Sequence, residues 1–300
     1  MNYYNEIREQ FINNKIYKQV KDYSKNRNDL ETYYNVGKLL IEAQGGESKA
    51  RYGDNLIKEY SVRLTEELGK GYTVSSLKRM RQFYSMIQKG AALRHQLTWT
   101  HYRELLKLKN INEINYYIDI SIKQNLSYRE LNNKIKDKEY ERLPNDTKDK
   151  LILNKETKVT DFIKNPIIIK TNNKIEITEK ILKQLILENI DDFLNELGED
   201  FCYRGNEYKI KIGDRYNYID LLLFNIKYNC YVVVELKVTE LKAEHIGQIS
   251  KYINYADKNI KTVNQNGTIG IIIFRKDNEF IMEYCSDSRI FQTTYKVDIN

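Results

Sequence analysis

The sequence predicts two domains: an all-α, helix-turn-helix-like domain over residues 1–145 and an α/β domain with a mixed sheet over residues 166–300. Three observations predict this division. The chain has only two prolines, Pro144 and Pro166, and they bracket a polar stretch that we expect to be a linker over residues 146–165. Segments before it repeat apolar residues at helical spacing and stop at glycines. Segments after it alternate between helical spacing and short β-branched or aromatic runs.

The composition is that of an ordinary globular protein. A hydrophobic fraction of 41% can fill two cores, and no stretch approaches the roughly 18 apolar residues of a membrane span. The first residues lack the basic start and apolar run of a signal peptide. Cys202, Cys230 and Cys285 form no C-x-x-C pair and no even disulfide set. We therefore expect a reduced, cytoplasmic protein without a membrane partner.

Three helices with clear boundary signals are predicted in the first half. Residues 30–43 and residues 55–68 are each followed by glycines, and Thr73 can cap a helix over residues 74–89. A helix, a short glycine turn and a basic helix together form the outline of a helix-turn-helix. A generic helical bundle has the same outline, so both interpretations stay open.

Positive charge concentrates in and after the third of these helices. Between Tyr72 and Asn110, eight basic residues stand against a single acid, Glu104. Such an excess attracts phosphate backbones by releasing condensed counterions, although a solvated helix face produces the same pattern. Ser127 and Glu130 then form a capping box that opens another basic helix. The residues that we expect to contact DNA are Lys78, Arg79, Arg81, Arg94 and Arg103.

The second half follows the order helix, three strands, helix, strand. The first helix is amphipathic, and a Gly-Asp-Arg turn joins the first two strands in a hairpin. The strand after the second helix is almost entirely apolar, and one further short strand is expected beyond it. The expected ranges are 178–197 for the first helix, 208–212, 216–224 and 231–238 for the three strands, 241–260 for the second helix, and 268–274 and 280–284 for the last two strands.

Two of these strands carry charges where burial predicts none. Residues 231–238 have apolar side chains on both faces, yet include Glu235 and Lys237, which share a face because side chains alternate along a strand. Asp220 interrupts the neighbouring apolar run in the same way. Burying unpaired charges is costly, so a cation such as Mg²⁺ held by the two carboxylates is one solution. A buried ion pair between Lys237 and either carboxylate is the other.

This pattern resembles a known nuclease superfamily. An Asp on one strand and Glu-x-Lys on the next, with helices before and after, is typical of PD-(D/E)xK nucleases, although Ile219 stands in the position of the nominal proline. More of the chain is similar to one branch, the YhcG-like family of bacterial proteins, which joins a helical domain to a restriction-endonuclease-like domain. The similar segments are residues 37–42, 63–72, 77–84, 97–102, 193–198, 218–222, 234–237, 247–248 and 268–270.

The resemblance implies roles for the charged strand residues. Asp220, Glu235 and the backbone carbonyl of Leu236 would hold Mg²⁺, for which Mn²⁺ could substitute. Lys237 would orient or deprotonate the attacking water and offset developing negative charge.

Three further residues resemble supporting elements of the superfamily. Gln248 and Tyr252, four apart on one helix face, are similar to the Gln-x-x-x-Tyr element of nucleases related to the RecB exonuclease domain. Glu188 resembles an additional acid near the metal. A solvated Gln beside a packed Tyr, and an exposed helix carboxylate, are the simpler alternatives.

We therefore expect a Mg²⁺-dependent DNA endonuclease that serves restriction, defence, repair or recombination, with a helical domain that contacts DNA or partners. A homodimer is expected because duplex cleavage needs two active sites or two visits, and other nucleic-acid-processing or defence proteins are candidate partners. The alternatives are a catalytically silent DNA-binding or assembly protein and an RNA-directed nuclease. No Walker A loop, dinucleotide glycine fingerprint or G-x-S-x-G motif occurs, and the three histidines lack metal-ligand spacing.

Overall fold

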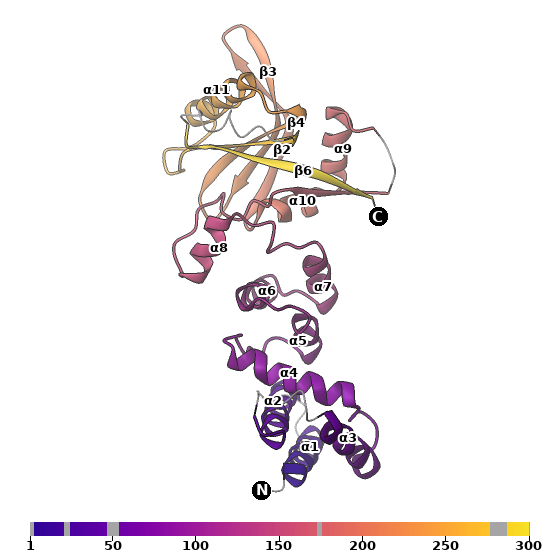
Figure 1. Cartoon of the computed structure of the whole chain (residues 1–300). Coiled ribbons are helices and arrows are strands. Elements are labelled where there is room, and N and C mark those ends of the chain that lie inside the picture. The colour runs from indigo at the N-terminus through magenta and orange to yellow at the C-terminus, as the bar shows by residue number, and fades with distance from the viewer. Residues whose placement is uncertain (1–2, 21–24, 47–53, 173–175, 277–286, 300) are drawn as a thin grey trace. The chain divides into compact units, whose positions relative to one another are not determined.

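The computed structural model describes residues 3–20, 25–46, 54–172, 176–276 and 287–299 (Figure 1). It divides into two compact units, unit 1 (Met1–Tyr140) and unit 2 (Glu141–Asn300). Within the described ranges, no helix is long and apolar enough to cross a membrane.

Unit 1 is entirely helical in its described part, as the sequence predicts. The second helix begins earlier than expected, at Lys25, and the third and fourth match the predicted segments closely. The helices are α1 (Tyr3–Val20), α2 (Lys25–Ala43), α3 (Asp54–Leu68), α4 (Val74–Gln88), α5 (Trp99–Leu105), α6 (Ile111–Lys123) and α7 (Tyr128–Lys136).

Local signals and one close approach build this unit. Thr73 caps α4, its hydroxyl accepting a hydrogen bond from the N–H of Ser76 (3.2 Å). Helices α2 and α4 cross at Gly37, where a Cβ atom would lie 2.2 Å from the carbonyl oxygen of Met80. Only glycine therefore allows this crossing distance, which brings α4 and its basic residues against α2.

Unit 2 contains one six-stranded mixed sheet with helices on both faces. The order of its strands is β1-β6-β5-β4-β3-β2, with β2, β3 and β4 antiparallel and β4, β5, β6 and β1 parallel. Its elements are α8 (Asn145–Ile152), β1 (Ile167–Thr171), α9 (Glu179–Glu188), α10 (Ile190–Leu197), β2 (Phe201–Ile212), β3 (Arg215–Asn225), β4 (Cys230–Glu240), α11 (Ala243–Asn259), β5 (Ile269–Lys276) and β6 (Ile290–Ile299).

The sheet separates two hydrophobic clusters, as its position between α9 and α11 in Figure 1 shows. Alternate residues of β3 and β4 contribute to opposite clusters: Leu221 and Val234 pack on the side of α9 and α10, whereas Leu222 and Val233 pack on the side of α11. The lack of a side chain at Gly270 allows α11 to lie close to β5. A Cβ atom at this position would lie only 2.7 Å from a side-chain carbon of Ile249. This close packing sets the height of α11 above the strands.

The predicted order of helix, three strands, helix and strand is present, with two differences. The helix expected over residues 178–197 is divided at Asn189, which adopts φ −128° and ψ 47° and separates α9 from α10. Strands β1 and β6 extend the sheet beyond the predicted core. The strand expected over residues 280–284 lies outside the described residues.

The segment expected to be a linker, residues 146–165, groups with unit 2 and contains most of α8. Some of its polar residues are bonded within the unit: Thr147 donates to the carbonyl of Asp161 (2.6 Å), and Lys150 pairs with the Asp161 carboxylate (2.7 Å). Polar composition alone therefore does not separate a hydrogen-bonded segment from a linker.

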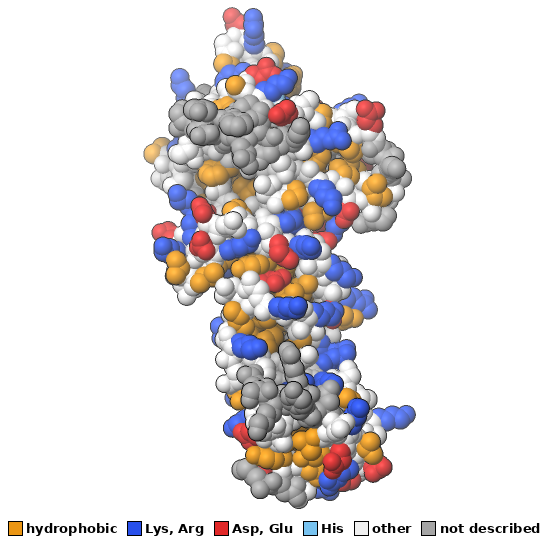
Figure 2. All heavy atoms as spheres, viewed as in Figure 1, with side chains coloured by type: hydrophobic (Ala, Val, Ile, Leu, Met, Phe, Trp, Pro, Cys, Tyr) orange, Lys and Arg blue, Asp and Glu red, His pale blue; other side chains and the backbone are white. Residues whose placement is uncertain are grey.

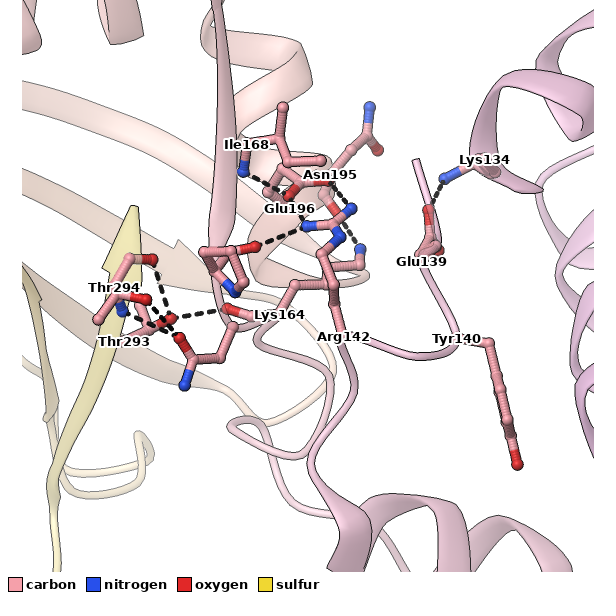
Figure 3. A network of polar contacts seen from close by, with 12 residues as sticks. Lys134, Glu139, Tyr140, Arg142, Lys164, Ile168, Asn195, Glu196, Thr293 and Thr294 are labelled. Atoms are coloured by element: carbon pink, nitrogen blue, oxygen red, sulfur yellow. Dashed lines mark hydrogen bonds and ion pairs between the residues drawn. The ribbon is translucent and has the colours of Figure 1, made fainter. Parts of the chain in front are cut away.

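A largely enclosed arginine, Arg142, joins the start of unit 2 to the sheet. Figure 3 shows the Arg142 guanidinium directed at Glu196 of α10, where its Nη2 donates to Oε1 (3.0 Å). Arg142 also donates to the carbonyl of Pro166 (2.8 Å), and Glu196 accepts from the N–H of Ile168 in β1 (2.9 Å). The pair thus joins the start of unit 2, α10 and β1, which gives these residues a fixed place in the domain.

Candidate active site

Strand β4 brings Glu235 and Lys237 together on the face that α11 covers. The Lys237 Nζ lies 3.3 Å from Glu235 Oε2, and the Glu235 residue is only 2% exposed. Flanking residues of β4 fill the core on both sides of the sheet, so the local sequence forms a central strand despite the two charges.

Asp220 lies where β3 and β4 separate. The paired residues of the two strands run as far as Leu221↔Val234 and no further. Beyond that point the Asp220 side chain reaches across, and its Oδ2 accepts a hydrogen bond from the N–H of Leu236 (2.9 Å). The carboxylate therefore replaces the missing ladder contact and is held at the junction of the strands. The ligand role of the Leu236 carbonyl stays a prediction.

A lysine that the sequence did not single out contacts Asp220. The Nζ of Lys183 in α9 lies 2.8 Å from Asp220 Oδ1 and 3.2 Å from Glu207 Oε1. Burial disfavours the ammonium, but the hydrogen bond and charge of Asp220, together with those of Glu207, raise the pKa of Lys183. A lysine among apolar helix residues carries no sequence signal of such a contact, since its partner lies on another element.

The electrostatics of Glu235 indicate an incompletely satisfied carboxylate. Burial, followed by the negative charge of Asp220, raises the pKa of Glu235 to about 7, against the opposing effect of Lys237. Its Oε1 is buried and makes no hydrogen bond of good geometry within the described part of the chain, and the nearby backbone of Asp220 lowers the pKa only as a minor effect. Two carboxylates within electrostatic reach and one unpartnered oxygen suit a hard divalent cation, which supplies the missing positive charge.

A cation at this site would have few ligands from the protein. Over residues 3–20, 25–46, 54–172, 176–276 and 287–299, no group of three or more His, Cys, Asp or Glu side chains converges. A site with two carboxylates matches Mg²⁺, which retains several waters.

Helix α11 supports Glu235 through Gln248. The Gln248 amide Nε2 donates to Glu235 Oε2 (3.1 Å) and lies 3.2 Å from the hydroxyl of Tyr252, one helical turn further. Tyr252 is buried, and burial raises its pKa. The predicted pair is thus brought to the site, with Gln248 in direct contact and Tyr252 acting through it.

His245, in the first turn of α11, lies beside the site without joining it. Its Nδ1 accepts a hydrogen bond from the N–H of Lys242 (3.1 Å), which caps the helix. Burial and the positive charge of Lys237 lower the pKa of His245, which favours the neutral imidazole.

The structure does not bring Glu188 to the carboxylate pair. Glu188 is exposed and accepts a hydrogen bond from Gln184 (2.9 Å) on its own helix. Because Lys183 faces Asp220 and Glu188 is five residues further, the Glu188 side chain points about 140° away around α9. An acid expected near the metal would have to occupy the Lys183 side of the helix.

The five basic residues expected to contact DNA fall on α4, on α5 and on the loop between them. Arg81 donates to the buried Gln44 (3.1 Å), whereas Arg94 and Arg103 are exposed. The hydroxyl of Tyr102 accepts from the N–H of Arg94 (2.6 Å) and so fixes the loop. Figure 2 shows Lys and Arg side chains spread over the visible part of unit 1 between α4 and α7, with few acids among them. Lys78 and Arg79 lie half-buried on α4.

Comparison with known proteins agrees with this architecture. The chain matches the model of the YhcG PDDEXK nuclease domain over residues 159–300 and the model of the DUF1016 N-terminal domain over residues 8–142. It is 26% identical over 282 residues to a protein named "Putative nuclease YhcG" from Escherichia coli (strain K12), covering 81% of this chain and 75% of that protein.

Two solved structures also align, over about half of their own length. A repair endonuclease from Pyrococcus abyssi is 18% identical with a TM-score of 0.29, covering 41% of this chain and 48% of that one. An EndoMS–dsDNA complex is 17% identical with a TM-score of 0.27, covering 43% and 48%. The two family matches together span both units, and the chain therefore belongs to the YhcG-like family, with a DUF1016 N-terminal domain followed by a PDDEXK nuclease domain.

Proposed function

We propose that this nuclease domain is a Mg²⁺-dependent DNA endonuclease whose reaction centre is Asp220, Glu235 and Lys237. The observation that carries the proposal is the buried Glu235 carboxylate, which has an unpartnered oxygen beside both a second carboxylate and an ammonium. A purely structural ion pair has no need of an unsatisfied buried acceptor.

Asp220 and Glu235 would hold the metal, together with the carbonyl of Leu236. Bound there, Mg²⁺ or Mn²⁺ supplies a Lewis acid for the scissile phosphate and lowers the pKa of a coordinated water. The strand junction provides the geometry, since the N–H of Leu236 already holds Asp220 in place.

Lys237 orients or deprotonates the attacking water and offsets the charge that develops on the phosphate. Gln248 fixes Oε2 of Glu235 (3.1 Å), which would leave Oε1 available to a cation. Tyr252 is a positioning residue that acts through Gln248.

In the proposed function, Lys183 gives up its contact with Asp220 when a divalent cation binds. Its ammonium neutralises Asp220 while no cation is present, so binding of a divalent ion competes with the Lys183–Asp220 contact (2.8 Å). Glu179 lies four residues before Lys183 and hence on the same side of α9, and its charge influences His245. Glu179 is therefore better placed than Glu188 to act as an additional acid.

Unit 1 supplies DNA contacts in this proposal, as a domain that extends to about residue 145. Lys78, Arg79, Arg81, Arg94 and Arg103 would hold backbone phosphates, which adds affinity without sequence specificity. A homodimer would place two reaction centres on one duplex.

The test incubates the purified protein with supercoiled, linear, single-stranded and junction DNA, and with RNA, in Mg²⁺ or Mn²⁺. Wild type should cleave DNA, Lys237→Ala should not, and the matched exposed-lysine variant Lys180→Ala should cleave like wild type. Equal cleavage by wild type and Lys237→Ala would assign the activity to a contaminant. Preferential cleavage of RNA would identify RNA, rather than DNA, as the substrate.

The Lys183–Asp220 contact favours one alternative. In this alternative the protein binds DNA without cleaving it, because lysines already neutralise its carboxylates. Calorimetric titration with Mn²⁺ separates the two functions. Metal binding that is lost in Glu235→Ala supports the nuclease, and absence of binding in wild type supports the silent protein.

A further inference from the structure

The hairpin of β2 and β3 has one face anchored in the domain and one face in solvent. It extends beyond α11 in Figure 1. Ile210 and Ile219 are buried in the cluster that includes α11. Asn217, the cross-strand partner of Ile210, accepts a hydrogen bond from Lys251 of α11 (3.2 Å). Because side chains alternate, the residues between these anchors point to the opposite face.

That opposite face carries two tyrosines and two lysines in register. Tyr216 is 57% exposed and Tyr218 is 53% exposed, and both paired lysines are exposed. Lys209 pairs with Tyr218 and Lys211 pairs with Tyr216 across the strands. The Lys209 Nζ lies 3.9 Å from the centre of the Tyr216 ring, a cation–π contact along the diagonal. We call these four residues the ribbon face.

The ribbon face leads directly to the candidate active site. Asp220 follows Tyr218 by two residues on β3, and Glu207 precedes Lys209 by two on β2. The sheet twists at this point, since Ile219 packs in the cluster of α11 whereas Leu221 packs in the cluster of α9 and α10. Asp220 and Glu207 both contact Lys183, which confirms that they point in one direction. Tyr218 is therefore only about 7 Å along the strand from the proposed metal-binding carboxylate.

The chemistry of this face fits nucleotides with accessible bases. Phenol rings two residues apart on a strand are about 6.8 Å apart, twice the rise of about 3.4 Å between successive nucleotides, so each ring can stack with a base. Aromatic rings beside lysines are the combination that binds single strands, since rings hold bases while ammonium groups hold phosphates. In a duplex the base faces are already stacked and unavailable.

We propose that the ribbon face binds an unpaired segment of DNA, with bases stacked on Tyr216 and Tyr218 and phosphates held by Lys209 and Lys211, and directs that strand to Asp220. The inference rests on the proposed nuclease function and narrows its substrate to DNA with unpaired nucleotides, such as ends, flaps or junctions.

The first test measures binding of the full chain in EDTA by fluorescence anisotropy, with a dT oligonucleotide and a duplex of equal length. Replacement of both tyrosines by Thr, which keeps β propensity, should weaken dT binding by about tenfold to a hundredfold and duplex binding by less than about threefold. The double Tyr→Phe variant keeps both rings and should bind dT like wild type. Lys209→Gln with Lys211→Gln should lower the salt slope of dT binding by about 1.4.

Equal losses on dT and duplex, or no loss on dT, would overturn the proposal. A second measurement does not depend on the variants: wild type is photo-cross-linked to an oligonucleotide that contains 5-iodouracil, and the adducts are mapped by mass spectrometry. Adducts at Tyr216 or Tyr218 support the ribbon face, and adducts confined to other residues refute it. Because both measurements omit metal, a protein that binds in this way but never cleaves would refute the proposed nuclease and leave the ribbon face standing.

Discussion

The raised pKa of Glu235 predicts an unusual dependence of stability on pH in the absence of metal. An ordinary glutamate pKa is 4.5, and burial beside Asp220 raises that of Glu235 to about 7. For an acid whose pKa is raised by folding, the folded state binds the proton more tightly than the unfolded state. Its contribution to stability is complete below pH 4.5 and is lost as the pH rises through 7. The difference between the pKa of Glu235 in the unfolded and in the folded chain corresponds to about 3 kcal/mol of unfolding free energy.

The variant Glu235→Gln removes this titration while keeping the shape of the side chain. Between pH 5 and pH 8 in EDTA, wild type should therefore lose about 3 kcal/mol more stability than Glu235→Gln. Cys230 begins β4 and is buried, so pulse labelling of its thiol at one fixed pH after equilibration in urea reports the unfolding of unit 2. Glu188→Gln, which changes an exposed acid, is the matched control and should follow wild type.

Identical pH dependence in wild type and Glu235→Gln would refute this reasoning, because Glu235 would then ionise in the folded protein as easily as in water. The same group also couples metal binding to protons. At pH 6 most Glu235 side chains carry a proton, so Mn²⁺ binding should release close to one proton, measurable by calorimetry in buffers of different ionisation enthalpy.

Three further outcomes are expected. Lys237→Ala should lower the DNA cleavage rate by about 10²- to 10⁴-fold in a plasmid assay while Mn²⁺ binding persists, and loss of metal binding would instead indicate a structural role. Lys183→Gln should tighten Mn²⁺ binding in calorimetry by about tenfold, because the competing ammonium is removed; weaker binding would contradict the competition. Gly270→Ala should lower unfolding free energy by about 1–3 kcal/mol through contact with α11, whereas Gly247→Ala, whose Cβ would have no neighbour within 4 Å, should not destabilise the domain in thermal unfolding.

Sequence periodicity predicted the central elements of unit 2 well. Strands β3 and β4 and helix α11 have strong patterns because each is packed against other elements, and burial selects apolar residues. Periodicity gives little information about residues 146–165, where Thr147 and Lys150 bond to Asp161 within the same unit. Periodicity also missed β1 and β6, which join the sheet through the pairing of β6 with β5 and of β1 with β6.

The charged residues of the candidate site were visible in the sequence for one physical reason: Asp220, Glu235 and Lys237 stand in apolar runs, where an unpaired charge is costly. The sequence therefore determined that the two strands carry charges within apolar runs, that Glu235 and Lys237 share a face, and to which family the chain is similar. Each of these follows from residues that are neighbours along the chain.

Only the tertiary structure decided which distant side chains complete the site. Lys183 reaches Asp220, Gln248 reaches Glu235, and Glu188 points away, because the rotation of α9 and α11 about their axes is set by packing against the sheet. Helical spacing predicts which residues share a face, but the direction of that face depends on the elements that pack against it.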